Sequence, residues 1–391
     1  MQSAALPYRN DARPLSRGGP LDALRFFAAF FMVVYHYAEQ APVSLFSLHP
    51  ALGRGYLATD FFLMLSGYVL GRAYGDRVAG RQVKDREFLL RRVARVWPSH
   101  LVMLSGFVAL ILVTSLVGIA PQNPQWFQWS QLPAQVFLVQ AWGFDGPSGW
   151  NTPTWTLSAL IFCYAAFPTL WRAFSRIRSP WAALAVGVLI FAAVDLACRP
   201  ILGEAAYRLP LKYGVIRALP LFLLGALIAR MGREVLVSAR MADGLGAAAI
   251  AGVVGLNLIG RFDHASLALL GLLIFAAGAS ARTGWAWAST AGRLSFSLYL
   301  TNQFVGVTWF GAQHVAAGKL VLGQPALWLT WALAFPAAIV FSALFERFVD
   351  APLQRWVKPR AEAPRLGRRG RSGATGFREG VPGLRARDET S

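Results

Sequence analysis

Ten mainly apolar segments of 16–21 residues recur along the chain, and this recurrence constrains the fold more than any other feature. A helix needs about 20 apolar residues to cross the hydrocarbon core of a bilayer. The composition agrees, because 55% of the 391 residues are hydrophobic and 15% are charged, whereas a soluble protein carries about 25% charged residues. We therefore predict an all-α membrane protein, a polytopic bundle of about ten transmembrane helices at residues 21–38, 56–71, 99–119, 155–171, 181–197, 213–229, 244–259, 265–281, 294–312 and 325–345.

The distribution of Lys and Arg gives this bundle a direction. If the N-terminus is cytoplasmic, 30 of the 38 Lys and Arg residues fall in cytoplasmic segments and 6 in outer loops. Cytoplasmic loops of membrane proteins carry such an excess, so we expect both termini to be cytoplasmic. The formal charge of +19 then reflects topology, and we expect no nucleic-acid partner.

Three regions follow from this topology. Residues 1–20 are expected to form a cytoplasmic N-terminal lead, with Pro20 suited to the first helical turn. Residues 21–356 are expected to form the transmembrane domain. Residues 357–391 are rich in Arg, Gly and Pro and poor in apolar residues, which is typical of a disordered segment, here a basic cytoplasmic tail.

The first apolar segment carries two polar side chains on one helix face. His36 follows Arg25 by eleven residues, which corresponds to about 20° beyond three full turns and a rise of about 16 Å. Ionisable residues within a span are costly and mark functional faces by default. Asp60 is expected at the depth of His36, where a carboxylate would fix the tautomer of the imidazole. The alternative for His36 is a histidine that is satisfied by helix packing.

The segment between the second and third spans is the most basic part of the predicted transmembrane domain. We interpret residues 72–98 as a cytoplasmic loop in which Arg91, Arg92 and Arg95 lie within about one helical turn. Guanidinium groups bind phosphate groups through paired hydrogen bonds. The alternative is that these residues fix topology and contact anionic membrane lipid, which we favour on the residues alone.

The predicted outer loop at 120–154 lacks Lys and Arg but contains several Trp, Asn and Gln residues. Aromatic faces beside amides suit a bound sugar, which makes Trp150 and Trp155 candidates for that role. An aromatic belt at the membrane interface is the favoured explanation for any single Trp.

Motifs of metal sites and of common soluble enzymes are missing from the sequence. Cys163 and Cys198 lie in apolar runs, which argues against a disulfide or a thiolate metal site. The five histidines show no ligand spacing, and HExxH, P-loop and GxSxG patterns do not occur. We expect no metal site and no tightly bound cofactor. Asp195 and Arg217 could each line a cavity or pair with another helix, and the sequence does not decide between these roles.

Four motifs occur in a fixed order over about residues 20–357. The first segment contains Arg-x10-His, the second contains LATDFFLMLSGYVLG, and RRVARVWPSHL leads from the basic loop into the third segment. The fourth motif is distributed over TPTWTLSALIFCYAAFP, LSFSLYLTNQF and FERFVDAPLQRW. In this order the motifs resemble those of the integral-membrane acyltransferases of family 3, which include bacterial O-antigen and exopolysaccharide O-acetylases.

The resemblance implies a ten-helix enzyme of the bacterial inner (cytoplasmic) membrane. Such an enzyme passes an acyl group, usually acetyl, from cytoplasmic acyl-CoA to a hydroxyl of a carbohydrate or lipid-linked glycan acceptor. Carried over to this chain, the resemblance makes His36 the catalytic residue and Arg25 its electrostatic companion, and it places the donor at three arginines, Arg91, Arg92 and Arg95. Further positions are candidates for acceptor binding or for structure: Ser66, Gly67, Trp150, Trp155, Ser158, Tyr299 and Asn302.

Two positions depart from the family pattern. Ala159, Leu160 and Ile161 follow Ser158 where the family often has glutamates, and Asn302 stands where it often has His. We expect these changes to leave the chemistry of the first helix intact and to affect the acceptor.

Our working hypothesis is general-base catalysis, in which His36 takes the proton of the acceptor hydroxyl and Asp60 orients the imidazole. Arg25 or the backbone at Ser66 and Gly67 would stabilise the oxyanion. An acyl-histidine that relays the acyl group outward is a mechanistic variant. The alternative functions are a transporter or flippase of a glycan or lipid-linked substrate, with Arg25, His36 and Asp60 as its polar path, and a catalytically inactive scaffold.

Overall fold

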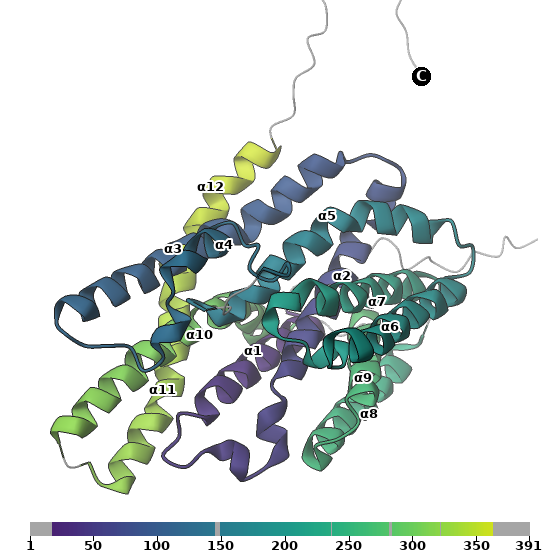
Figure 1. The fold of residues 1–391 in the computed structure, drawn as a ribbon. Coiled ribbons are helices and arrows are strands. Elements are labelled where there is room, and N and C mark those ends of the chain that lie inside the picture. The colour runs from purple at the N-terminus through teal and green to yellow at the C-terminus, as the bar shows by residue number, and fades with distance from the viewer. Residues whose placement is uncertain (1–17, 145–148, 236, 281–283, 321, 363–391) are drawn as a thin grey trace, which may run out of the picture.

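The computed structural model describes residues 18–144, 149–235, 237–280, 284–320 and 322–362. Within these ranges the chain forms helices and loops and contains no strand (Figure 1). A π-helical segment at Glu346–Asp350 joins the last two α-helices. The α-helices are α1 (Pro20–Ala38), α2 (Tyr56–Ala79), α3 (Asp85–Leu116), α4 (Leu132–Val136), α5 (Trp155–Ser175), α6 (Pro180–Leu202), α7 (Gly214–Glu234), α8 (Ala239–Ile259), α9 (Asp263–Ala279), α10 (Ala286–Lys319), α11 (Gln324–Phe345) and α12 (Ala351–Glu362).

Seven helical segments among the described residues are long and apolar enough to cross a membrane. They correspond to α1, α3, α5, α6, α7, α8 and the long segment that begins with α11, and α9 is a shorter apolar helix. The chain is therefore an all-helical, multi-pass membrane protein. Each of the ten predicted segments coincides with one of these helices, α2 or α10. The number ten and the side of the termini stay predictions.

Two predicted boundaries are wrong. Most of residues 72–98 is helical, because α2 continues to Ala79 and α3 already begins at Asp85. Acidic residues in the first turn of α3, Asp85 and Glu87, favour a helix start because they complement the helix dipole. The chain is also helical to Glu362, beyond the predicted start of the tail. Residues 1–17 and 363–391 of the predicted lead and tail lie outside the described residues.

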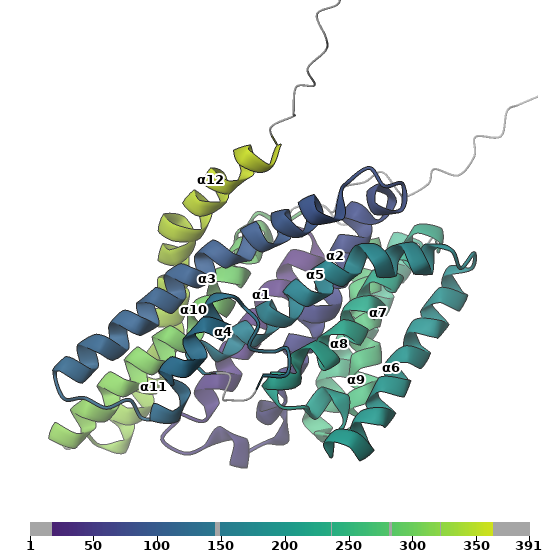
Figure 2. The same ribbon diagram turned by 45° about the horizontal axis from the view of Figure 1, so that its top comes forward.

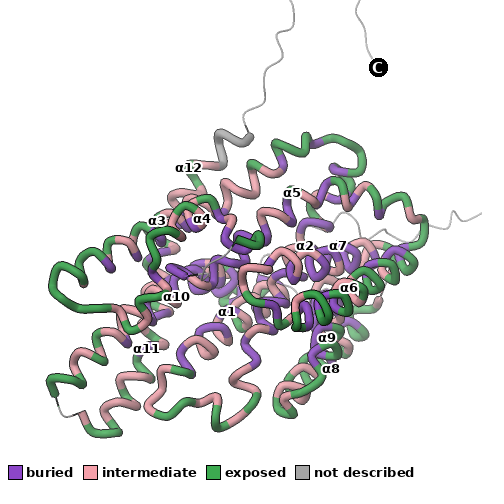
Figure 3. The backbone as a smooth tube through the Cα atoms, viewed as in Figure 1, coloured by how far each residue is buried: buried purple, intermediate pink, exposed green. Residues whose placement is uncertain are grey.

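The helices α2 and α7 pack at the centre of the bundle, where Figure 3 shows a concentration of buried backbone. A Cβ atom on Gly67 would overlap the carbonyl oxygen of Phe222, and one on Gly225 would overlap the carbonyl oxygen of Met64. Small residues allow such close approach of helix backbones in membrane proteins. The two glycines are therefore reciprocal contacts that set the spacing of α2 and α7.

The outer helices turn large apolar side chains away from this centre. In Figure 2, α3 runs along one side of the bundle and α6 along the opposite side. Leu116 at the end of α3 is 87% exposed, and Leu189 on α6 is 67% exposed. Extended apolar surface of this kind suits lipid rather than water.

The helix α1 is fastened to α10 along its length. A Cβ atom on Gly292 would crowd Asp22, and one on Gly306 would crowd Tyr37. The hydroxyl of Tyr37 donates a hydrogen bond to the carbonyl oxygen of Asn302 at 2.8 Å. This close packing fixes the side chains at the end of α1 against the middle of α10.

Candidate active site

His36 lies in the last turn of α1 and contacts α10. Its Nδ1 is 2.6 Å from Oδ1 of Asn302. The imidazole also packs beside the ring of Tyr35, with 5.5 Å between the ring centres. His36 is therefore positioned by a helix 266 residues away in sequence.

The hydrogen bonds of Asn302 define the tautomer of this histidine. The amide nitrogen of Asn302 donates to the carbonyl oxygens of Leu298 and Tyr299, at 3.2 and 2.6 Å. The amide oxygen therefore faces His36 and accepts a hydrogen bond from Nδ1–H, since an amide oxygen has no proton to donate. Neutral imidazole carries one proton, so Nε2 is the nitrogen with a lone pair.

A large cavity of about 890 Å³ opens beside His36. It is bordered by the end of α1, the start of α2, the end of α3 and the second half of α10, together with the loops around Pro121 and Pro153. Aromatic and aliphatic side chains make up much of its wall, including Tyr35, Phe46, Ile111 and Trp126. A cavity of this size and character is suited to a small organic ligand.

The predicted pairing of Asp60 with His36 is wrong. Asp60 is fully buried, and its Oδ1 accepts a hydrogen bond from Nε of Arg217 on α7 at 2.8 Å. Arg217 also borders the cavity, so this residue has both of the roles that the sequence left open, lining a cavity and pairing with another helix. A buried carboxylate needs a cationic partner more than it needs a neutral imidazole, which explains why Asp60 binds Arg217.

The loop before α5 is attached to α10 next to His36. Tyr299 donates to the carbonyl oxygen of Pro153 at 2.7 Å, and Asn151 donates to the carbonyl oxygen of Leu300 at 2.9 Å. Trp155 follows this loop, and both Trp155 and Tyr299 line the cavity. Of the acceptor candidates, these two have the geometry to contact a ligand.

Other predicted acceptor candidates are structural. Trp150 is fully buried, has a left-handed backbone with φ of 59°, and its indole donates to the carbonyl oxygen of Gln128 at 2.9 Å. The hydroxyl of Ser158 accepts a hydrogen bond from the backbone of Ala141 at 3.1 Å. Neither residue borders the cavity.

The proposed oxyanion groups also lie elsewhere. Ser66 donates to the carbonyl oxygen of Phe62 within α2 at 2.8 Å, and Gly67 faces α7. Arg25 lies 3.6 Å from Asp22 at the start of α1. These three residues do not border the cavity, so the prediction that one of them stabilises an oxyanion at His36 is wrong for this structure.

The arginines of α3 gather near Arg25, at the end of the bundle away from the cavity. Arg95 lies within electrostatic range of Arg25, and Tyr164 lies within that range of Arg25, Arg92 and Arg95. Arg92 donates to the hydroxyl of Tyr74 at 2.6 Å and lies over its ring. Three cations thus converge where an anionic ligand could bind.

Two acidic residues hold arginines of this group. Nη1 of Arg95 lies 3.1 Å from Oδ1 of Asp350 in the π-helical segment, and Arg91 pairs with Glu87 at 2.7 Å. The side chain of Arg95 is still 41% exposed. Asp350 was not among the predicted site residues, although it lies within the motif FERFVDAPLQRW and an acidic residue in a motif is a candidate partner for an arginine.

A buried cluster of side chains lies at the wall of the cavity, which Met32 and Tyr299 border. Met32, one turn before His36 on α1, packs in a buried cluster with Tyr299 and Ala58, against which Phe62 also packs. The ring centres of Phe62 and Tyr299 are 5.6 Å apart. Arg25 and His36 thus lie towards opposite ends of α1, and the arginines of α3 gather at the Arg25 end.

Most of the chain matches the model of one known protein family. The family model described as an acyltransferase domain, of acyltransferase family 3, matches residues 20–347. The chain belongs to acyltransferase family 3. The match covers α1 to α11, and it includes His36, Arg25 and the arginines of α3.

Two curated proteins are similar to this family 3 acyltransferase over parts of their length. Acyltransferase MdmB of Streptomyces mycarofaciens is 30% identical over 203 residues, which are 49% of this chain and 50% of the relative. Protein 2 in the picA locus of Rhizobium radiobacter is 35% identical over 99 residues, or 25% of this chain and 48% of the relative. The chain thus spans about half the length of the curated relatives that it matches. No solved structure matches it.

Proposed function

We propose that this family 3 acyltransferase moves an acyl group from acyl-CoA to a hydroxyl of a carbohydrate or lipid-linked glycan in the bacterial inner membrane. The observation that carries the proposal is the hydrogen bond between Nδ1 of His36 and Asn302, at 2.6 Å, in the wall of a cavity of about 890 Å³. This hydrogen bond supports a role for His36 as a base, because it defines the tautomer of the imidazole where a substrate in the cavity can reach it.

In the proposed reaction His36 acts as the general base. Nε2 takes the proton of the acceptor hydroxyl while the hydroxyl oxygen attacks the thioester carbonyl. The carbon–sulfur bond then breaks, and the proton on His36 passes to the leaving thiolate of CoA. Atoms and charges balance without a further reactant. Such proton transfer is worth about 10²- to 10⁴-fold in rate.

The donor is proposed to bind at Arg25, Arg92 and Arg95, since guanidinium groups suit the phosphates of CoA. The reactive end of the donor must then pass Met32 to reach His36, over an axial distance of about 16 Å. A donor inserted along this path would deliver an acetyl group to the cavity without an acyl-enzyme intermediate. Acetyl is the proposed acyl group, and no tightly bound cofactor is required.

The test is transfer of radiolabelled acetyl from acetyl-CoA to membrane glycans by purified protein in nanodiscs. We expect His36→Ala to lower the rate at least about 10²-fold. His264→Ala is the matched control, because His264 lies on α9 outside the cavity and contacts Asp195. Its rate should stay within about twofold of wild type.

A defined result would overturn the proposal. If wild-type protein transfers no acyl group from acetyl-CoA or longer acyl-CoAs, yet moves a lipid-linked glycan across the bilayer, the chain is a transporter. Equal transfer rates for wild type and His36→Ala would reject His36 as the base.

A further inference from the structure

Arg217 occupies an unusual position for a cation. It lies in the first turn of α7, where the helix dipole disfavours positive charge, and it is 6% exposed. Its guanidinium lies between the aromatic rings of Tyr56 and Trp155, at 5.8 and 5.6 Å from their centres. Helix electrostatics therefore does not account for an arginine here.

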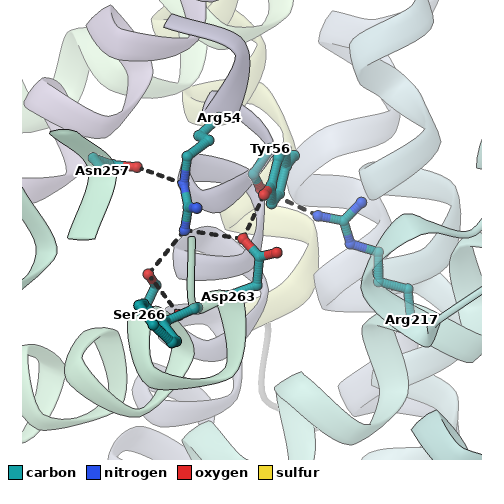
Figure 4. A network of polar contacts seen from close by, with 7 residues as sticks. Arg54, Tyr56, Arg217, Asn257, Asp263 and Ser266 are labelled. Atoms are coloured by element: carbon teal, nitrogen blue, oxygen red, sulfur yellow. Dashed lines mark hydrogen bonds and ion pairs between the residues drawn. The ribbon is translucent and has the colours of Figure 1, made fainter. Parts of the chain in front are cut away.

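One of the three nitrogen atoms of the Arg217 guanidinium is not used in a hydrogen bond to a described residue. Nε binds Asp60 at 2.8 Å, and Nη2 binds the carbonyl oxygen of Tyr56 at 3.2 Å, as Figure 4 shows for Arg217 and Tyr56. Among the residues that the structure describes, Nη1 has no hydrogen-bond partner. Because Arg217 borders the cavity, this nitrogen is available to a ligand there.

The same cavity wall connects Arg217 with His36. Tyr35 and Tyr299 line this cavity together with Arg217 and His36. Tyr35 packs against the imidazole of His36, and the carbonyl oxygen of Tyr299 holds the amide of Asn302. A ligand bound at Arg217 is therefore close to the groups that orient His36.

The charges around the cavity favour an uncharged ligand. Arg217 is the one Arg or Lys among the described residues that line it, and Glu39 is the one Asp or Glu. Asp60 already balances the charge of Arg217, so an anionic ligand would leave an excess negative charge in a poorly hydrated site. A neutral hydroxyl or ether oxygen can accept the hydrogen bond from Nη1 without this cost.

We propose that Arg217, held by Asp60, is the acceptor-positioning residue: Nη1 donates to an uncharged oxygen of the acceptor next to the hydroxyl that reacts. This rests on the proposed function and narrows its acceptors to neutral hydroxyl compounds. The apolar wall of the cavity accommodates an attached hydrocarbon group.

The experiment measures equilibrium binding of tritiated hexyl β-D-glucopyranoside to the full chain in nanodiscs. Arg217→Met should raise the Kd about 10- to 100-fold, as expected for loss of a hydrogen bond to a charged group. Hexyl β-D-glucuronide, which adds a carboxylate to the same sugar, should bind wild type at least about tenfold more weakly.

Two further variants keep the experiment decisive. Arg230→Met is the matched control, because Arg230 also lies on α7 and donates to the carbonyl oxygens of Phe174 and Ile177, but it does not border the cavity or join the network of Arg54, Asp263 and Tyr56 in Figure 4. Its Kd should stay within about threefold of wild type. The double variant Asp60→Leu with Arg217→Met removes both charges, which avoids an unpaired buried carboxylate if the single variant does not fold, and it should bind as weakly as Arg217→Met.

Several outcomes would overturn this site. The first is that wild type does not bind the glucoside. The second is that wild type and a folded Arg217 variant have equal Kd values, and the third is that wild type binds the glucuronide more tightly than the glucoside. Acetyl transfer separates this proposal from the proposed function. Binding that depends on Arg217 without any transfer contradicts only the acyltransferase reaction. Acetyl transfer together with binding that does not depend on Arg217 contradicts only the positioning role. That role also predicts that Arg217→Met raises the KM for the acceptor and leaves the KM for acyl-CoA unchanged.

Discussion

Asn302 lies 2.6 Å from His36 and donates through its amide nitrogen to two carbonyl oxygens of its own helix. Asn302 stands where the family often has His, and its contact with His36 differs from what the sequence led us to expect. The position was expected to leave the chemistry of the first helix unchanged, yet it supplies the immediate partner of the proposed base. A neutral amide fixes the tautomer of His36 without adding a charge.

The first prediction concerns this amide. Asn302→Ala should lower kcat about 10- to 100-fold because the imidazole loses the hydrogen bond that orients it, while the KM for acyl-CoA stays unchanged. Initial rates with labelled acetyl-CoA test this. Thr301→Ala is the control, since Thr301 is buried next to Asn302 but bonds only to Ser297 of its own helix. Equal kcat values for the two variants would contradict the prediction.

The second prediction concerns the donor end. Arg95→Ala should raise the KM for acyl-CoA about 10- to 100-fold, since a charge-assisted hydrogen bond to phosphate is lost. Asp350→Asn should raise the same KM, because Asp350 holds the guanidinium of Arg95 at 3.1 Å. Arg355→Ala serves as control, since Arg355 bonds to a carbonyl oxygen of its own helix. An unchanged KM in Arg95→Ala would place the donor elsewhere.

The third prediction concerns the central helix pair. Gly225→Ala should destabilise the protein by about 1–3 kcal/mol through overpacking, since the added Cβ would overlap the backbone of Met64. Gly244→Ala on α8 is a matched control with open space around the added Cβ, and it should be neutral or slightly stabilising. Chemical unfolding in detergent, followed by circular dichroism, compares the two variants. Similar losses would show that close packing of α2 and α7 is not needed.

The fourth prediction compares two ion pairs. Arg54 and Asp263 are both nearly buried and lie 2.9 Å apart, so Asp263→Ala should cost about 3–5 kcal/mol by leaving a buried cation unpaired. Asp85 and Arg172 form a pair at 2.6 Å in which Asp85 is half exposed, and Asp85→Ala should cost about 0–1 kcal/mol. Apparent melting temperatures in one detergent rank the two variants. The reverse ranking would contradict the burial argument.

The helical segments could be predicted from the sequence, because hydrophobic length is a local property of the chain. Each predicted segment coincides with a helix, and Pro20 occupies the first helical position as expected. The predicted end of the second segment and the predicted start of the third were wrong, because a helix can extend beyond its apolar stretch and a polar sequence does not reveal where it stops.

The partners of buried polar groups could not be predicted in the same way. Asp60 and His36 were paired because adjacent antiparallel helices place them at similar depth. The structure gives Asp60 to Arg217 and His36 to Asn302, on helices that lie more than 150 residues further along the chain. Helical periodicity gives the face of a residue, but not which distant helix packs against that face.

The sequence by itself determined that this chain is a helical membrane protein with Arg25 and His36 on one helix face, and its motifs resembled those of one acyltransferase family. These are properties of composition, spacing and local order. Only the tertiary structure decided that His36 is held by Asn302, that Arg217 borders the cavity, and that Trp150 and Gly67 are packing residues. The physical reason is that a buried hydrogen bond or ion pair depends on the mutual packing of helices that are far apart in sequence.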